Sequence, residues 1–246
     1  MSRIEGKVAL VTGANRGIGR AFVEELLENG SAKIYAAARK EETLAGLVKM
    51  GKGRVVPLTL DVTDAKMISK IASECRDVDI LINNAGIAAF EGIISAKDDS
   101  SARQEMETNF FGTLNMVRAF APVLGENGGG TIVNISSIAG HVNFPAIGSY
   151  SASKAAVHSL TQCIRAELAE QMTLVTGVYP GPVDTEMVAS FSADKTPPNT
   201  VVKTILKGVE DGLEDIFPDG AAQEMHSNIL SDPKAMEKEA GQMLPA

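Results

Sequence analysis

Tryptophan is absent from this 246-residue chain, and cysteine occurs only at Cys75 and Cys163. Two cysteines are too few for a disulfide scaffold, and neither has a histidine or a second cysteine at metal-ligand spacing. We therefore expect two reduced thiols that serve packing, and no metal site. No apolar run reaches the roughly 20 residues of a membrane span, and the first residues show no plausible signal cleavage site. These absences favour a cytoplasmic protein with no membrane partner.

Positive charge is also scarce. The chain has 23 Lys and Arg against 31 Asp and Glu, a formal net charge of −8. A nucleic-acid partner is therefore not expected, because phosphate contacts require a basic surface. The hydrophobic fraction of 44% and the charged fraction of 22% are typical of a globular domain.

Short apolar runs alternate with longer amphipathic stretches. The runs, which predict strands, are residues 7–12, 33–38, 55–60, 80–83, 131–135 and 174–179. Helices are predicted at 17–29, 101–124 and 151–170. Such alternation is typical of right-handed βαβ units. We expect one domain over 1–246 of the α/β class, a doubly wound parallel sheet (Rossmann fold) in three α/β/α layers.

The alternation is lost after Gly181. Residues 190–198 are polar and contain prolines, which predicts a mobile loop. Residues 201–212 predict a helix and 215–218 a short edge strand. We interpret the region around 186–212 as a loop and helix insertion that contacts the substrate.

A glycine-rich loop follows the first predicted strand and opens the first helix. Gly13 permits a tight turn, Gly17 lets the backbone approach a pyrophosphate, and Gly19 lets helix and strand pack closely. The helix N-terminus adds N–H donors and a positive potential for phosphate. This arrangement predicts a dinucleotide site.

The Gly-x-x-x-Gly-x-Gly spacing, with Asn-Asn-Ala-Gly at 83–86 and Tyr-Ser-Ala-Ser-Lys at 150–154, resembles the short-chain dehydrogenase/reductase family. The resemblance implies a nicotinamide cofactor and an oxidoreductase. Besides Tyr150 and Lys154, it implies cofactor contacts from Gly13, Asn15, Arg16, Gly17, Ile18, Gly19, Asp61, Val62, Asn84, Ala85, Gly86, Pro180, Gly181, Val183 and Thr185. An Asp61 that only caps the next turn is the alternative at that position, and Asn83 is expected to tie strands together.

The end of the second strand favours NADP(H) over NAD(H). A carboxylate there would hold the ribose 2′-OH of NAD, but this chain has Ala38 and Arg39. The guanidinium of Arg39 instead suits the 2′-phosphate of NADP. Arg16 in the glycine loop could contact the same phosphate from the other side. Two ordinary solvated arginines are the alternative.

Tyr150 and Lys154 are four residues apart on a predicted helix and therefore share a face. A free tyrosine has a pKa of about 10 and moves protons poorly at neutral pH. A nearby ammonium and a cationic nicotinamide ring would both lower that pKa, which suits general acid–base catalysis. The resemblance implies that this pair is catalytic. It adds Ser137, which hydrogen-bonds the substrate oxygen, and Asn109, which holds a water linking Lys154 to solvent; an Asn109 that only bends its helix is the alternative.

The predicted activity is NADP(H)-dependent, reversible reduction of a carbonyl, on a substrate that is a hydrophobic ketone or aldehyde. Candidates for the substrate pocket are His141, Asn143, Phe144, Ile147, Phe90, Met187 and Phe191. Two alternatives stay open: an NAD(H)-preferring alcohol dehydrogenase of the same family, and a non-catalytic NADP(H)-binding regulator. The regulator is disfavoured because Tyr150 and Lys154 are both kept. The resemblance also implies a homodimer or homotetramer, with 101–124 and 151–170 at the interface. The tail departs from the carrier-protein reductase branch, which puts acyl-carrier substrates in doubt.

Overall fold

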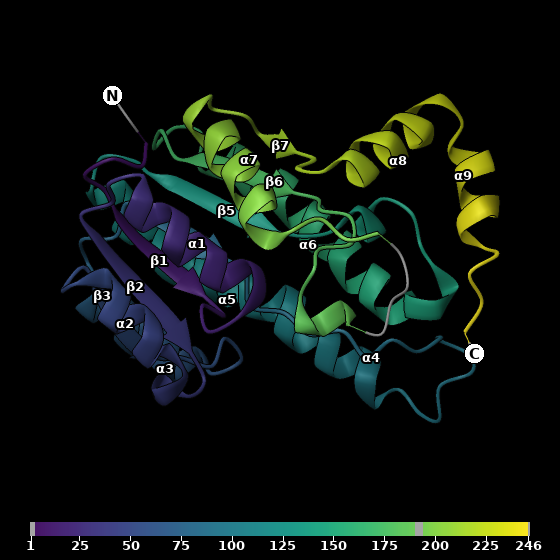
Figure 1. Cartoon of the computed structure of the whole chain (residues 1–246), viewed down its shortest axis with the longest axis horizontal. Coiled ribbons are helices and arrows are strands. Elements are labelled where there is room, and N and C mark those ends of the chain that lie inside the picture. Colours follow the sequence, from purple (N-terminus) through teal and green to yellow (C-terminus); the bar gives the residue numbers. More distant parts are fainter. Residues whose placement is uncertain (1–2, 190–193, 246) are drawn as a thin grey trace.

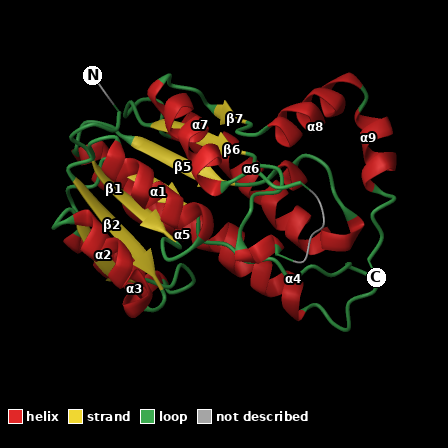
Figure 2. Ribbon diagram, viewed as in Figure 1, coloured by secondary structure: helices red, strands yellow, loops and turns green. Residues whose placement is uncertain are grey.

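A parallel sheet forms the centre of the protein in the computed structural model, which describes residues 3–189 and 194–245. In the described part of the chain the strands lie in the order β3-β2-β1-β4-β5-β6-β7 (Figures 1 and 2). They are β1 (Val8–Thr12), β2 (Lys33–Ala38), β3 (Val55–Thr59), β4 (Ile80–Asn83), β5 (Thr131–Ile135), β6 (Leu174–Val178) and β7 (Asp215–Ile216). The predicted fold class is confirmed, and each strand lies within two residues of its predicted bounds.

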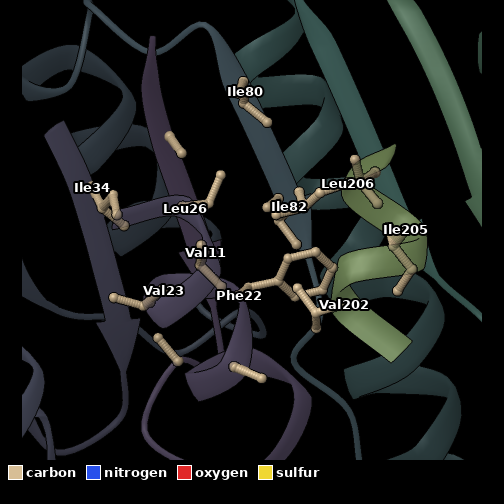
Figure 3. Packing of buried hydrophobic residues seen from close by; sticks show 14 of the residues in the cluster. Val11, Phe22, Val23, Leu26, Ile34, Ile80, Ile82, Val202, Ile205 and Leu206 are labelled. Atoms are coloured by element: carbon tan, nitrogen blue, oxygen red, sulfur yellow. The ribbon is translucent and has the colours of Figure 1, made fainter. Parts of the chain in front are cut away.

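Helices cover both faces of the sheet. The first face carries α1 (Gly17–Glu28), α2 (Ala45–Gly51) and α7 (Pro198–Glu210). The second carries α3 (Ala65–Glu74), α5 (Gly112–Glu126) and α6 (Gly148–Glu167). On the first face, Phe22 of α1 and Val202 of α7 pack together over Ile82 of β4 (Figure 3). Burying a side chain of this size contributes about 1.5–3 kcal/mol to the free energy of unfolding. The packing therefore holds the helices of this face firmly against the strands.

The predicted helix at 101–124 contains a π-helical interruption. Helix α4 (Ser100–Glu105) runs into a π-helical segment, Met106–Phe111, which continues as α5. Such bulges place one extra residue in a turn and are frequent at functional sites. Here the bulge carries Asn109, which is 1% exposed.

Helix α6 begins three residues earlier than the predicted Ser151. Gly148 opens it, and a Cβ at this position would lie 2.9 Å from Cγ1 of Ile93. The absence of a side chain therefore lets the helix start against the loop before α4. Tyr150 consequently lies in the first turn of α6 and Lys154 one turn further along.

Two helices in the polar tail were not predicted. They are α8 (Gly220–Ser231) and α9 (Pro233–Ala240), whose N-caps Asp219 and Asp232 accept backbone N–H groups. Both lie beyond the β7 edge of the sheet, and the chain end returns toward the loop before α4 (Figure 1). There the Ala146 N–H donates to the Met243 carbonyl at 2.9 Å. Part of the predicted mobile loop, with Phe191, lies outside the described residues, and no described helix is long and apolar enough to cross a membrane.

Candidate active site

A cavity of about 870 Å³ opens at the carboxyl ends of the strands. It lies where the strand order reverses between β1 and β4, the position at which doubly wound sheets bind ligands. Its lining includes most of the residues predicted for the cofactor and the chemistry: Gly13, Asn15, Arg16, Gly17, Ile18, Arg39, Asp61, Val62, Asn84, Ala85, Gly86, Ser137, Tyr150, Lys154, Pro180, Gly181, Val183 and Thr185. The predicted Gly19 and Asn109 are not among the described lining residues.

The glycine loop has the geometry that its spacing predicts. Gly13 and Gly17 have φ of +64° and +52°, a left-handed conformation that favours glycine. A Cβ on Gly19 would lie 2.1 Å from the Gly13 carbonyl oxygen, and one on Gly17 would lie 3.1 Å from Cγ2 of Thr185. The loop thus leaves its backbone uncovered by side chains at the N-terminus of α1. Such a loop can accommodate the phosphates of a dinucleotide.

Thr12 holds this loop in place, which the spacing of the glycines does not predict. Its hydroxyl accepts hydrogen bonds from the Asn84 N–H at 2.9 Å and the Ala85 N–H at 3.0 Å. The Asn84 side chain in turn donates to the Gly13 carbonyl at 3.2 Å. Asn83 bonds Asn134 of β5 at 2.9 Å, as expected of a residue that ties strands together.

Two arginines line the cavity from different elements. Arg39 is exposed at the end of β2. Arg16 is the N-cap residue of α1, and its Nη1 pairs with Oε2 of Glu186 at 2.7 Å. Asp61 lines the cavity, but its carboxylate accepts the N–H and the hydroxyl of Thr63 at 2.9 and 2.8 Å. Its Oδ1 therefore caps a turn, and a contact of Asp61 with the adenine stays a prediction.

Tyr150 and Lys154 share one face of α6, with Lys154 Nζ 5.6 Å from the centroid of the tyrosine ring. Nζ donates to the Ile135 carbonyl at 2.8 Å, and burial lowers the pKa of this lysine to about 8. Within the protein alone, burial raises the pKa of Tyr150 to about 12, against an opposing effect of the Ser137 hydroxyl, and the charge of Glu105 adds to the rise. The lowering of this pKa that a cationic nicotinamide ring would cause stays a prediction.

Ser137 follows β5 and lies next to Tyr150. Its backbone is extended, and its Oγ accepts the Ala139 N–H at 3.1 Å and donates to the Pro180 carbonyl at 3.4 Å. These two bonds fix the hydroxyl in the lining of the cavity. The neighbouring Ser136 instead donates to the Lys154 carbonyl at 2.8 Å and is buried. Both serines line the cavity, and they differ in that the Ser136 hydroxyl is engaged by the backbone of α6.

Asn109 joins the helix of the π bulge to two neighbouring segments. Its amide accepts the Ile87 N–H at 2.9 Å and donates to the Ile87 carbonyl at 3.0 Å and to Ser153 Oγ at 2.8 Å. A Cβ on Gly86 would lie 3.2 Å from Asn109 Oδ1 and 3.5 Å from Lys154 Nζ. Asn109 and Lys154 therefore both approach the backbone at Gly86, which has no side chain. The water expected between them stays a prediction.

His141 does not lie in the cavity, contrary to its prediction as a pocket residue. Its ring packs against His158 and Tyr179, with centroids 4.4 and 4.5 Å apart. Of the other pocket candidates in the described chain, Met187 lines the cavity. Cys163 is exposed and donates to Glu167 at 3.2 Å, so it is not the packing thiol that was expected, whereas Cys75 is buried.

Residues 7–196 match the family model described as short chain dehydrogenase. The chain belongs to the short-chain dehydrogenase family. The predicted oxidoreductase class is confirmed by this match. The dehydrogenase has no group of three or more His, Cys, Asp or Glu side chains in its described residues that could hold a metal ion.

Several known proteins are similar to this short-chain dehydrogenase. An NADP-dependent 3-hydroxy acid dehydrogenase from Schizosaccharomyces pombe is 34% identical over 82% of each chain. A 3-oxoacyl-[acyl-carrier-protein] reductase from Vibrio harveyi is 35% identical, over 78% of this chain and 80% of that one. The crystal structure of a short chain dehydrogenase from Burkholderia cenocepacia in complex with NADP superposes with a TM-score of 0.92 at 42% identity, covering 97% of this chain and 98% of that one.

Proposed function

We propose that the protein is an NADP(H)-dependent carbonyl reductase, which converts a ketone or aldehyde to an alcohol in a reversible reaction. One observation carries the proposal: Tyr150, which lies one helical turn from the buried Lys154, lines the same cavity as Ser137 and the glycine loop. Met187 and Val188 give the cavity apolar surface, which supports a hydrophobic substrate.

The cofactor is NADP(H). Arg39 and Arg16 offer guanidinium groups for a 2′-phosphate, and β2 ends without the carboxylate that would hold a ribose 2′-OH. The NADP in the Burkholderia cenocepacia complex and the NADP dependence of the Schizosaccharomyces pombe relative support this choice. Along the cavity, the glycine loop would hold the pyrophosphate and Asn84 would lie at the adenosine. Thr185 would hold the nicotinamide.

The protein's part in the chemistry is to bind the carbonyl oxygen and supply a proton. When bound, the nicotinamide supplies the hydride that reduces the carbonyl carbon. The Ser137 and Tyr150 hydroxyls donate hydrogen bonds to the carbonyl oxygen, where negative charge develops. Tyr150 then gives up its proton to that oxygen, and the Lys154 ammonium stabilises the tyrosinate that remains. Asn109 orders the water through which Tyr150 is reprotonated.

Tyr150→Phe tests the assignment, because it removes the proton and keeps the ring. The assay is NADPH oxidation over a panel of aldehydes, aryl ketones, β-keto esters and quinones, with NADPH binding measured by fluorescence. We expect kcat to fall by about 10²- to 10⁴-fold, the usual contribution of a positioned acid, with NADPH affinity within about twofold of wild type, since the substitution leaves the arginines and the glycine loop in place. Tyr35→Phe, on β2 away from the cavity, is the matched control and should keep full activity.

The same assay separates the alternatives. Equal or higher kcat/KM with NADH would favour the NAD(H)-preferring alcohol dehydrogenase. NADPH binding without turnover on any substrate of the panel would favour the non-catalytic regulator. Retention of most of kcat in Tyr150→Phe would overturn the assignment of Tyr150.

A further inference from the structure

The segment between β4 and α4 contacts α6 both before and after Tyr150. At the start of the segment, a Cβ on Gly86 would lie 3.5 Å from Lys154 Nζ. Further along, a Cβ on Gly148 of α6 would lie 2.9 Å from Cγ1 of Ile93. Tyr150 lies between Gly148 and Lys154 on the same helix. The segment is therefore placed to form one wall of the substrate site.

The backbone of this segment is strained at Phe90. Its φ is +55°, in the left-handed region, which a bulky side chain rarely adopts. Such a conformation costs free energy and persists only where the surrounding contacts hold it. Two residues later the segment packs against the end of the chain, where a Cβ on Gly92 would lie 2.7 Å from Pro245 Cγ. Strained backbone is typical of binding and catalytic sites, which indicates a functional role for the turn at Phe90.

Glu105 holds the residue before this turn. Its side chain is buried at the end of α4, and Oε1 accepts the Ala89 N–H at 2.7 Å. Ala89 is exposed, and a backbone N–H at the surface can bond water instead. Glu105 Oε2 is buried and has no hydrogen-bond partner in the part of the chain that the structure describes, so the carboxylate is costly to bury. An apolar side chain would fill the same space at lower cost, so what Glu105 adds is a fixed position for Ala89.

Asn109 holds the same segment from one helical turn further along. Its amide accepts the N–H and donates to the carbonyl of Ile87, which lines the cavity. Glu105 and Asn109 thus fix three backbone groups of the segment from one continuous run of helix. Because Ala89 is fixed on one side of Phe90 and the chain end packs on the other, the turn has little freedom to relax.

We propose that the turn at Ala89 and Phe90 is part of the wall that binds the substrate, and that Glu105 is a positioning residue that keeps this turn in its strained conformation. The inference rests on the proposed function. Without the hydrogen bond to Glu105, the turn is relaxed in part of the molecules, and the fraction that can bind substrate falls. The apparent affinity for the substrate falls by the same factor, while the rate from the bound state is kept because Tyr150 and Ser137 stay in place.

Glu105→Met removes the acceptor for Ala89 and keeps an apolar side chain of similar length. In NADPH-driven reduction of the substrate panel, we expect KM for the carbonyl to rise roughly fivefold to twentyfold, with kcat and NADPH affinity within about twofold of wild type. The melting temperature should not fall, because a costly buried charge is lost, which separates this effect from damage to the fold. Glu105→Gln keeps an oxygen for Ala89 and should keep KM near the wild-type value. Glu74→Met, the same substitution at an exposed position of α3, should leave KM unchanged.

Phe90→Gly tests the role of the strain. Glycine adopts a positive φ without a steric cost, so the turn should depend less on its hydrogen bond to Glu105. In the Phe90→Gly background, Glu105→Met should raise KM less than about twofold, whatever effect Phe90→Gly has by itself. An equal rise in both backgrounds would show that Glu105 does not act through the turn and would overturn the inference. An unchanged KM in folded Glu105→Met would overturn it as well.

A second readout needs no substrate. Amide hydrogen exchange in peptides that cover residues 87–92 should be faster in Glu105→Met than in wild type or Glu105→Gln, because the Ala89 N–H loses its acceptor. Unchanged exchange would show that Glu105 does not hold the turn. If Tyr150→Phe kept its activity, the proposed function would fail instead, and hydrogen exchange would still decide whether Glu105 holds this segment.

Discussion

Lys154 places an ammonium in the protein interior, where it is 5% exposed. Its hydrogen bond to the Ile135 carbonyl compensates only part of the lost hydration, and burial lowers its pKa from 10.5 to about 8. The folded protein therefore binds this proton more weakly than the unfolded chain does, and the charged lysine destabilises the fold. Residues retained at such a cost are typical of active sites, where function and stability oppose each other.

Lys154→Met should make the protein more stable and less dependent on pH. Between about pH 8 and pH 10.5 the unfolded chain holds the proton that folded Lys154 has lost. The free energy of unfolding of the wild type should therefore rise with pH across this window, by at most about 3 kcal/mol. The variant should lack this rise and be more stable at pH 7, as measured by urea unfolding at pH 7 and pH 10. Lys49→Met, at an exposed position of α2, is the control, and an equal rise in Lys154→Met would contradict the argument.

Most residues of the candidate site could be predicted from the sequence because they directly follow strand ends or share a helix face. Gly13 follows β1, Asn84 follows β4 and Ser137 follows β5, so parallel strands bring them to one edge. The position of Glu186 against Arg16 could not be predicted in this way. The contact depends on which segment packs beside the glycine loop, and a glutamate after a strand is usually a solvated charge.

Strands were easier to predict than helices in this chain. A strand buried on both faces, such as β1, reads as a continuous apolar run whatever its neighbours are. Helices α8 and α9 instead bury only a few side chains, including Met236 and Ala240, against the Val142 and Phe144 region. Their apolar content is too sparse for a periodic signal, although the capping residues Asp219 and Asp232 were visible in the sequence.

An ion pair links two elements that both line the candidate cofactor site. Arg16 belongs to the glycine loop, and Glu186 begins the short helix after β6. Both side chains are more than half exposed, at 52% and 75% for Arg16 and Glu186, so the pair adds little stability by itself. A 2′-phosphate bound at Arg16 would compete with the Glu186 carboxylate for the same guanidinium.

Glu186→Gln should therefore tighten NADPH binding and leave NADH binding unchanged. The gain should be roughly twofold to fivefold at low salt, the range expected from releasing an exposed ion pair, and smaller at high salt because salt screens the pair. Fluorescence titration with NADPH and NADH measures both affinities. Glu24→Gln, which removes the partner of Arg20 on the outer face of α1, should change neither. Equal tightening for both cofactors would show that Glu186 does not compete with the 2′-phosphate.

At the scale of the whole molecule, the three histidines of the chain come together although they lie far apart in the sequence. His141 follows β5, His158 belongs to α6 and His226 to α8. His226 stacks on Phe217 with centroids 3.7 Å apart, and His158 Nδ1 lies 2.7 Å from the Tyr179 hydroxyl. This cluster attaches the C-terminal helices to the sheet, and no pattern in the sequence indicates it because each member comes from a different element.

The histidine cluster should make the fold sensitive to acid. Burial, and then the charges of His158 and His226, lower the pKa of His141 from 6.5 to about 4, against an opposing effect of Asp215. The unfolded chain therefore takes up this proton first, and stability is lost as the pH falls from about 6.5 toward 4. His141→Phe keeps the ring and removes the titration, so its melting temperature should fall less between pH 7 and pH 5 than that of the wild type. Glu224→Gln, at an exposed position of α8, should follow the wild type, and an equal fall in His141→Phe would show that the cluster does not control acid stability.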